Sequence, residues 1–335
     1  MKSNFEFLHC YWPALAEIGE AAEKYLYSDP NASIFKMGLF AERLVLEIFV
    51  FERIDEPQID NTHANRIRIL KRSGLLPRDI DDTLYLLRKT RNSAVHAGAD
   101  SEEEAKVLLS MMHNLAVWFM KTYGNWNFIA PSFVMPDNVP SPNFEELFAE
   151  QEKKIAELSK QLETVTTAAS GTTQKDRIKQ SEKVTAMINW TEAQTRCLID
   201  EQLRKSGWEV DSNNLRYSKG TRPIKGRNIV ISEWPTNSEF SKNGFADYAF
   251  FVGEQLIAFM EAKRFSEDVA AAIDVQVKDY ATHLKEESAK YIINTWKNIQ
   301  VPFLFASNGR PYLEQIRTKS GIWFLDARSS SNQPY

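Results

Sequence analysis

The sequence predicts a chain of two folded parts, a helical domain followed by an α/β domain with a mixed central sheet. Through residues 5–129, apolar residues recur at spacings of three and four, which is typical of amphipathic helices. Four prolines then fall within residues 131–142, where no helix can continue. Beyond residue 175, short apolar runs alternate with helical patterns, which is typical of α/β layers.

These observations divide the chain into three predicted segments. The first is a helical domain over residues 1–130, in which residues 33–54 form the clearest helix, with Ser33 as its expected N-cap. The second, residues 131–175, holds the proline-rich linker and a helix in which apolar residues from Phe144 to Val165 follow a heptad pattern. That helix either packs on its own chain or self-associates. The third is the α/β domain over residues 176–335.

The composition limits what the chain can be. Its 335 residues are 43% apolar, which is enough to bury more than one core. The net charge of -4 argues against a surface that is basic throughout, so any contact with nucleic acid must be local. Cys10 and Cys197 are far apart and form no zinc motif, which fits a reducing compartment. With neither a signal peptide nor a stretch of about 20 apolar residues, we expect a cytoplasmic protein without membrane contact.

Within the α/β domain, residues 191–205 read as a helix that Thr191 caps and Gly207 ends. Four short runs, at residues 229–232, 245–252, 256–263 and 301–306, read as strands, and residues 270–285 read as a helix between the last two. Asp247 stands near the start of the second run, whereas Glu261 and Lys263 end the third. The pattern therefore predicts two acids and an amine at one edge of a hairpin.

This grouping has the chemistry of a phosphodiester-cleaving site. Mg²⁺ prefers oxygen ligands, and Asp247, Glu261 and the carbonyl of Ala262 would supply three of them. Lys263 shares a strand face with Glu261 because side chains alternate with a period of two, so its ammonium group could orient water or neutralise phosphate charge.

The register of this hairpin decides whether the site exists. Asp247 lies opposite Glu261 only if paired residues have numbers that sum to 508, which leaves Gly253, Glu254 and Gln255 as a three-residue loop. A two-residue turn would place the carboxylates on opposite faces unless a bulge restored the phase.

Flanking helices offer weaker support for the site. Gln276 and Tyr280 are four residues apart and share a helix face, where they could position the lysine, the water or a phosphate. Glu192, in the first turn of the preceding helix, could add an outer carboxylate. Taken singly, each of these residues is typical of a solvated surface, and it is their joint order that favours a site.

A basic stretch precedes the strands of the site. It contains no acid within twelve residues, and its members are Arg216, Lys219, Arg222, Lys225 and Arg227. Such a stretch either contacts DNA phosphates without base specificity or forms a solvated loop.

The order Asp247, then Glu261-Ala262-Lys263, then Gln276 and Tyr280 resembles the PD-(D/E)xK nuclease motif with the QxxxY extension of RecB-type nucleases. Together with residues 191–196, Gly207-Trp208 and residues 305–310, it is similar to the nuclease region of the R subunit of type I restriction enzymes, over residues 176–330. Ala246 replaces the proline that often precedes the motif aspartate, which removes no ligand.

This resemblance implies a restriction-endonuclease-like fold and a Mg²⁺-dependent double-stranded DNA endonuclease, with Mn²⁺ as a substitute metal. Asp247 and Glu261 would bind the metal and Lys263 would position water. The family's motor has a GxxxxGK[ST] loop, which this sequence lacks, so no ATP site is expected here. The implied partners are DNA and the methyltransferase and specificity subunits of a restriction-modification complex.

A second motif opens an alternative function. Arg91 and His96 stand in an R-x4-H spacing that resembles HEPN-like helical domains, which implies metal-free RNA cleavage or RNA binding, with the α/β domain as a docking scaffold. The competing interpretation is that Arg91, Asn92 and His96 form hydrogen bonds inside the helical core. In a third interpretation, the helical domain and the heptad helix serve only assembly.

Overall fold

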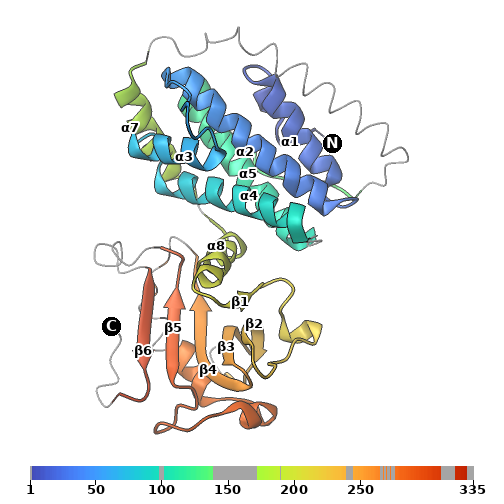
Figure 1. Cartoon of the computed structure of the whole chain (residues 1–335), viewed down its shortest axis with the longest axis vertical. Helices are drawn as coiled ribbons and strands as arrows, with labels where there is room; N and C mark the ends of the chain where they lie inside the picture. The colour runs from blue at the N-terminus through green and yellow to red at the C-terminus, as the bar shows by residue number, and fades with distance from the viewer. Residues whose placement is uncertain are drawn as a thin grey trace. The chain divides into compact units, whose positions relative to one another are not determined.

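The computed structural model describes residues 2–97, 102–138, 172–188, 190–238, 244–264, 267, 269, 272, 276–310 and 321–329. The chain forms two compact units, Met1–Ile188 and Asn189–Tyr335, which are drawn in Figure 1. The first is helical and the second contains a mixed sheet, so the predicted combination of α and α/β folds is confirmed. The heptad pattern of residues 144–165 lies outside the described residues.

The helical unit is built around α2, a helix of 23 residues, Pro30–Glu52. Its other elements are η1 (Glu6–Leu8), α1 (Pro13–Tyr25), α3 (His63–Arg72), α4 (Arg78–Ala97), α5 (Glu102–Phe119), the π-helical turn η2 (Met120–Gly124) and α7 (Gln174–Thr185). The helices α1, α4 and α5 all pack against α2, which explains why α2 buries apolar residues along its whole length. None of the helices in the described part of the chain is long and apolar enough to cross a bilayer.

The start of α2 differs from the prediction. Asp29, not Ser33, is the N-cap, because its side chain accepts a hydrogen bond from the Ala32 N–H at 2.9 Å. Pro30 then occupies the first helical position, where its missing N–H costs nothing. Ser33 lies inside the helix, fully buried, and its hydroxyl donates to the Ala22 carbonyl at 2.7 Å. It therefore links α2 to α1.

The helix α7 packs on the helical unit. Trp118 Nε1 donates to Ser181 Oγ at 2.9 Å, and Arg177 makes a two-pronged ion pair with Glu52 at 2.7 Å for each contact. The boundary predicted between residues 175 and 176 thus falls inside α7, and the sheet unit begins after it.

The sheet unit has six strands in the order β1-β2-β3-β4-β5-β6. They are β1 (Glu209–Val210), β2 (Asn228–Pro235), β3 (Phe245–Val252), β4 (Gln255–Ala262), β5 (Phe303–Ser307) and β6 (Ile322–Asp326). The β1–β2 and β4–β5 pairs are parallel and the other pairs antiparallel, so the sheet is mixed as predicted. The strands β1 and β6 were not predicted.

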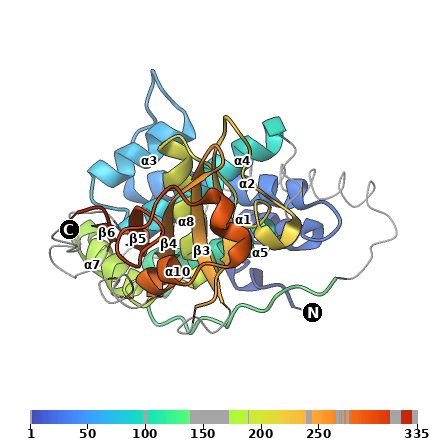
Figure 2. The same ribbon diagram turned by 90° about the horizontal axis from the view of Figure 1, so that it is seen from below.

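Helical elements cover both faces of this sheet. The helix α8 (Glu192–Lys205) starts at the predicted cap Thr191 and packs through Ile199 on the face that holds Tyr248, Phe250 and Met260. The short helix α10 (Lys278–Thr282) packs through Tyr280 on the other face, and both helices are labelled in Figure 2. Two further short helices, η4 (Tyr217–Lys219) and η6 (Glu286–Tyr291), lie in connections. Each sheet face therefore carries its own apolar cluster.

The β3–β4 hairpin reaches the predicted register by a different route. Tyr248 pairs with Met260 and Phe250 with Ala258, so the numbers sum to 508 near the acids. Val252, however, pairs with Gln255, which leaves a turn of Gly253 and Glu254 only. The predicted three-residue loop is wrong. A β-bulge at Ile257 restores the phase, because it adds one residue to β4 that has no partner on β3.

The close contact between α2 and α4 gives a prediction for the fold. A Cβ atom at Gly38 would lie 2.3 Å from Cδ and 2.7 Å from Cβ of Arg91, too close to be relieved by moving the guanidinium alone. Replacing Gly38 with alanine should therefore destabilise the helical unit by about 1–3 kcal/mol, as overpacking does. The measurement is the free energy of unfolding from urea titration.

The matched control is the same change in an Arg91→Ala background. Arg91→Ala removes the Cγ and Cδ contacts and leaves only the Cβ of residue 91, 2.7 Å from the added methyl group, so the loss caused by alanine at position 38 should be clearly smaller than in the wild type. An equal loss in both backgrounds would contradict the proposed clash.

Candidate active site

The two predicted acids converge at one end of the β3–β4 hairpin. Asp247 of β3 and Glu261 of β4 come one step beyond the Tyr248–Met260 pair, so they stand opposite each other on neighbouring strands. Their side chains are only 14% and 8% exposed. Burial of two facing carboxylates is costly unless other groups compensate their charges.

Glu261 is held from both sides by residues that the sequence singled out. Lys263 Nζ lies 2.7 Å from Glu261 Oε1, so the two side chains share a strand face as their spacing predicted. The Tyr280 hydroxyl donates to Glu261 Oε2 at 2.9 Å. An amine and a phenol therefore fix this carboxylate.

Asp247 is compensated differently. Its Oδ2 accepts the backbone N–H of Ala262 at 2.8 Å, and its Oδ1 accepts a short hydrogen bond from the Arg196 guanidinium. Because the N–H and C=O of one strand residue point to the same side, the Ala262 carbonyl also faces the β3 side, where Asp247 lies. Both carboxylates and this carbonyl thus belong to one local group of oxygens.

Arg196 is a site residue whose role the sequence did not reveal. It projects from α8, its side chain is 15% exposed, and it bonds to Glu192 Oε1 at 2.9 Å as well as to Asp247. Its Nη1 also lies 3.8 Å from Glu233 Oε1. The one available signal was the spacing of four residues between Glu192 and Arg196 on a helix, which is too common to suggest a site.

Glu233 was also missed. It stands in β2 opposite Asp247, between the Ser232–Tyr248 and Trp234–Ala246 pairs. Its φ of 54° lies in the left-handed region, which non-glycine residues seldom adopt and which is often found at functional sites. Its carboxylate forms an ion pair with Arg216, in which Oε1 lies 3.1 Å from Nη1 of the arginine. The acids of β2, β3 and β4 therefore form a row across three strands.

A buried network fixes α8 beside this row. The hydroxyl of Tyr248 donates to Asp200 Oδ1 at 2.8 Å, and the N–H of Ser212 donates to Asp200 Oδ2 at 2.7 Å. Both Tyr248 and Asp200 are buried. Because Asp200 lies one helical turn beyond Arg196, this anchor sets the position from which the guanidinium reaches Asp247.

The electrostatics of the site follow from burial. Desolvation, together with the charge of Glu261, raises the pKa of Asp247 to about 7, although Arg196 and the Ala262 N–H oppose the shift. Burial disfavours the charge on Arg196, but Asp247 and neighbouring anions outweigh it and hold its pKa above the ordinary value. A further cation near Asp247 and Glu261 would relieve the repulsion between them.

The two other predicted supports occupy the margins of the site. Gln276 lies half-buried just before α10, four residues ahead of Tyr280. Glu192 is 50% exposed and pairs with Arg196, so it reaches the acids only through that guanidinium and through its charge, which raises the pKa of Asp247 slightly.

The donor set fits a hard divalent cation. Carboxylate and carbonyl oxygens are the ligands that Mg²⁺ prefers, and each carboxylate oxygen has a second lone pair besides the one engaged in its present contact. Buried charges in proteins are usually paired or coordinate a metal. Asp247, Glu261 and Ala262 are therefore the residues that could hold a metal.

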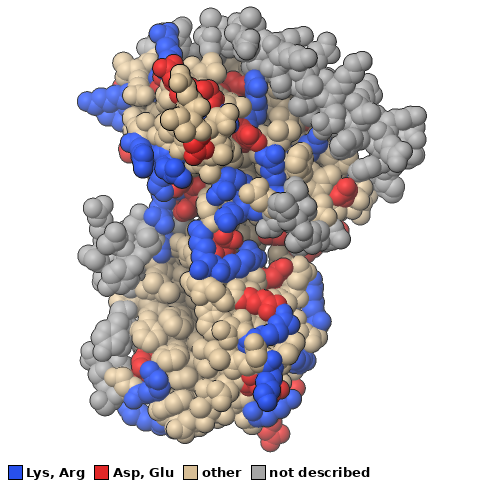
Figure 3. All heavy atoms as spheres, in the orientation of Figure 1, with Lys and Arg blue, Asp and Glu red and all other residues tan. Residues whose placement is uncertain are grey.

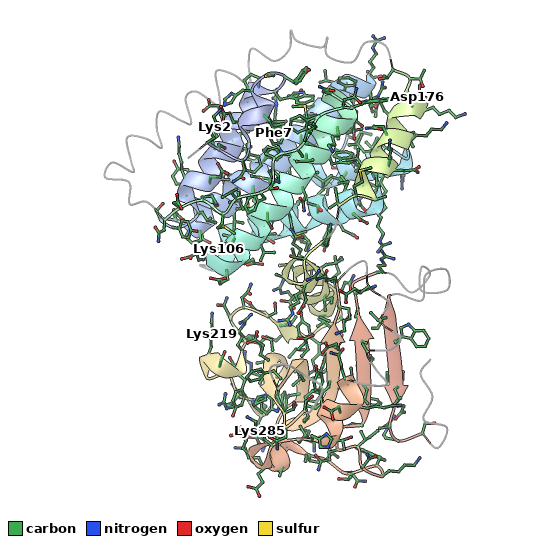
Figure 4. All side chains as sticks on the ribbon, turned by 180° about the vertical axis from the view of Figure 1, so that it is seen from behind. Lys2, Phe7, Lys106, Asp176, Lys219 and Lys285 are labelled. Atoms are coloured by element: carbon green, nitrogen blue, oxygen red, sulfur yellow. The ribbon has the colours of Figure 1, made fainter. Side chains whose placement is uncertain are left out.

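The predicted basic stretch is largely paired within the unit. Arg216 binds Glu233 and also the Ser212 carbonyl at 2.7 Å, and Arg227 is ion-paired with Glu209. Arg222 stacks on the ring of Tyr217 at 3.6 Å. Lys219, labelled in Figure 4, lies on η4, and Lys225 is exposed. On the face seen in Figure 3, basic and acidic side chains are intermixed over this part of the unit.

The arginine of the helical motif is ion-paired on a partly exposed surface. Arg91 Nη1 lies 2.7 Å from Glu42 Oε2, and its guanidinium stacks over the ring of Phe35 at 4.8 Å. Asn92 is exposed. The side chain of His96 lies outside the described residues, so the predicted Arg91–His96 site stays a prediction.

The raised pKa of Asp247 predicts how pH affects stability. The carboxyl group of an unfolded aspartate has a pKa of about 3.9, so between about pH 4 and 7 the folded state binds more protons than the unfolded state. The contribution of Asp247 to the free energy of unfolding therefore falls as pH rises through this window, by at most about 1.4 kcal/mol per pH unit. Asp247→Asn removes this dependence.

The measurement is the free energy of unfolding of Asp247→Asn and of the wild type, each in the presence of a chelator. The difference, variant minus wild type, should increase from about pH 4 to about pH 7. Glu254→Gln, at the exposed turn of the same hairpin, is the control and should show no such trend. A parallel pH response of Asp247→Asn and the wild type would show that burial does not shift this group.

Two family models match parts of the chain. A family model described as the second domain of the type I restriction enzyme EcoKI endonuclease subunit matches residues 209–335, and a model for a domain of unknown function (DUF4145) matches residues 20–163. The HEPN-like assignment of the helical unit stays a prediction. No solved structure matches the chain at a significant level.

The relative found among curated proteins is the type I restriction enzyme EcoKI endonuclease subunit of Escherichia coli strain K12. It is 29% identical in an alignment of 405 positions, which covers 99% of this chain and 34% of that subunit. The chain thus spans about a third of the length of its relative. The predicted resemblance to the endonuclease subunit of type I restriction enzymes is thereby confirmed over nearly the whole chain.

Proposed function

We propose that the sheet unit is the Mg²⁺-dependent endonuclease module of a type I restriction-modification R subunit, and that it cleaves double-stranded DNA. The observation that carries this proposal is the convergence of Asp247, Glu261 and Lys263 at one end of a hairpin, with Glu261 held between Lys263 and Tyr280. The similarity to a type I endonuclease subunit supports the same reaction class.

Each residue has a role in this proposal. Asp247, Glu261 and the Ala262 carbonyl would hold Mg²⁺, which when bound supplies Lewis-acid activation of the phosphate and of a water molecule. Lys263, already 2.7 Å from Glu261, would neutralise charge on the phosphate oxygens or orient the water. Tyr280 fixes Glu261 through its hydroxyl, and Gln276 would help to align the substrate.

The substrate and partners follow from the same resemblance. Lys219, Arg222 and Lys225 would contact DNA phosphates, whereas Arg216 and Arg227 are occupied by Glu233 and Glu209. Contacts of this kind read no base sequence, so sequence specificity would come from partner subunits that methylate and recognise DNA. Mn²⁺ would replace Mg²⁺ as an oxygen-seeking metal.

The alternative of an RNA-cleaving helical unit is not favoured. The curated relative is an endonuclease subunit of a restriction enzyme, and its similarity extends through the helical unit. In addition, the guanidinium of Arg91 is bound to Glu42 and packed on Phe35, which is the arrangement expected of a structural ion pair.

Substitution of the three convergent residues tests the proposal directly. Asp247→Asn, Glu261→Gln and Lys263→Met should each lower the rate of plasmid DNA cleavage with Mg²⁺ by at least about 100-fold, because each removes a metal ligand or the charge beside the phosphate. The matched control is Glu254→Gln, which removes a carboxylate from the far end of the same hairpin and should cleave like the wild type. Full activity in any of the three site variants, with the fold intact by circular dichroism, contradicts the assigned roles.

Removal of the metal separates the two candidate functions. The wild-type chain should cleave double-stranded DNA with Mg²⁺ or Mn²⁺ and lose this activity in EDTA, since the carboxylates alone cannot activate water for the reaction. RNA cleavage that survives EDTA and is lost in Arg91→Ala would instead support the helical unit as the active part.

A further inference from the structure

The site already contains a cation of its own. The Arg196 guanidinium donates through Nη2 to Asp247 Oδ1, and the two side chains are 15% and 14% exposed. Because Oδ2 of the same carboxylate is bound to the Ala262 N–H, both oxygens of Asp247 are engaged in the chain as it stands. Arg196 thus compensates a buried charge that would otherwise face Glu261 without a counter-ion.

A divalent cation bound to Asp247 would compensate the same charge. The guanidinium and the metal would then lie side by side in a largely buried space, where like charges repel strongly because little water screens them. Each oxygen of Asp247 keeps a spare lone pair, but the two cations would compete for the charge of one carboxylate, and their repulsion would drive the guanidinium away when the metal binds.

The structure provides two acceptors for the withdrawn guanidinium. Glu192 lies one turn before Arg196 on α8 and already accepts a hydrogen bond from it at 2.9 Å. Oε1 of Glu233 lies 3.8 Å from Nη1 of Arg196. The backbone of Glu233 has a left-handed conformation, and its carboxylate is also paired with Arg216. Both carboxylates are more exposed than Asp247, so the guanidinium would move toward solvent while it remains ion-paired.

We propose that Arg196 is the internal counter-cation of the metal-free site, and that a divalent metal displaces it from Asp247 toward Glu192 and Glu233. This inference rests on the proposed function, because it requires a metal at Asp247. The helix α8 then carries the group that stabilises the site when no metal is bound. The same group lowers the affinity of the site for the metal, because the metal has to displace it. Arg196 is in this sense a positioning residue, not a catalytic one.

Chemical modification of the unaltered protein tests the displacement. Phenylglyoxal reacts with accessible arginine, and peptide mass spectrometry reports each site. Saturating Mn²⁺ should raise the modification rate of Arg196 by about threefold or more, since the side chain leaves a site where it is 15% exposed. Arg204, two turns further along α8 and bonded to the Val210 carbonyl, is the internal control and should not change. An unchanged or lower rate at Arg196, in protein that titration shows to be saturated with Mn²⁺, overturns the inference.

A substitution tests the competition. In calorimetric titration at pH 8, Arg196→Met should bind Mn²⁺ at least about tenfold more tightly than the wild type, because the metal no longer has to displace a cation. Arg227→Met should match the wild type within about twofold, because its partly exposed ion pair with Glu209 lies at the start of β2, away from Asp247 and Glu261. If Arg196→Met does not fold, Arg196→Lys is the second variant. It keeps the positive charge but loses the guanidinium that contacts both Asp247 and Glu192, so it should bind Mn²⁺ more tightly than the wild type and by less than tenfold. An affinity equal to or weaker than that of the wild type overturns the inference.

The two proposals fail in different ways. If the wild type binds no Mn²⁺, or if Asp247→Asn binds it equally well, then the metal site of the proposed function is wrong and the inference falls with it. If the wild type binds Mn²⁺ through Asp247 but Arg196 neither becomes reactive nor competes, only the inference fails, and Arg196 is a permanent structural partner of the acid.

Discussion

The site depends on one electrostatic constraint, the confinement of two carboxylates on adjacent strands with little access to water. Neither Asp247 nor Glu261 could keep its charge in such a place alone. Each has its own compensation: an arginine and a backbone N–H for Asp247, an amine and a phenol for Glu261. Most of the neighbouring architecture, from the anchoring of α8 by Asp200 to the packing of α10 beneath the sheet, holds these compensating groups in position.

The hairpin that brings the acids together combines a tight turn with an irregular strand. Gly253 has a φ of 59°, which favours glycine and permits the chain to reverse over two residues. A turn of that length by itself would send Asp247 and Glu261 to opposite faces. The bulge at Ile257 corrects the phase, so that an irregularity only a few residues after the turn decides whether a site can form.

The two units use arginine differently. In the helical unit, Glu42 and Glu52 pair with Arg91 and Arg177 in contacts that join separate helices. There each ion pair links one helix to another and serves packing. In the sheet unit, Arg196 meets Asp247, whose pKa is raised by burial and by the charge of Glu261, so the same type of contact holds a charge that a metal could also satisfy.

Local sequence patterns were enough to predict the order of helical and sheet regions, the central strands, the cap of α8 and the placement of Lys263 on the face of Glu261, because periodicity and capping are local properties. They also pointed to Tyr280, since a spacing of four residues on a helix is local too. The folded chain was needed to show that Arg196 and Glu233 lie beside Asp247, that a bulge rather than a longer loop sets the register, and that Arg216 and Arg227 are paired with acids. These features arise from contacts between residues distant in the chain, and no local pattern in the sequence encodes which of several charged partners will meet when the sheet and α8 pack together.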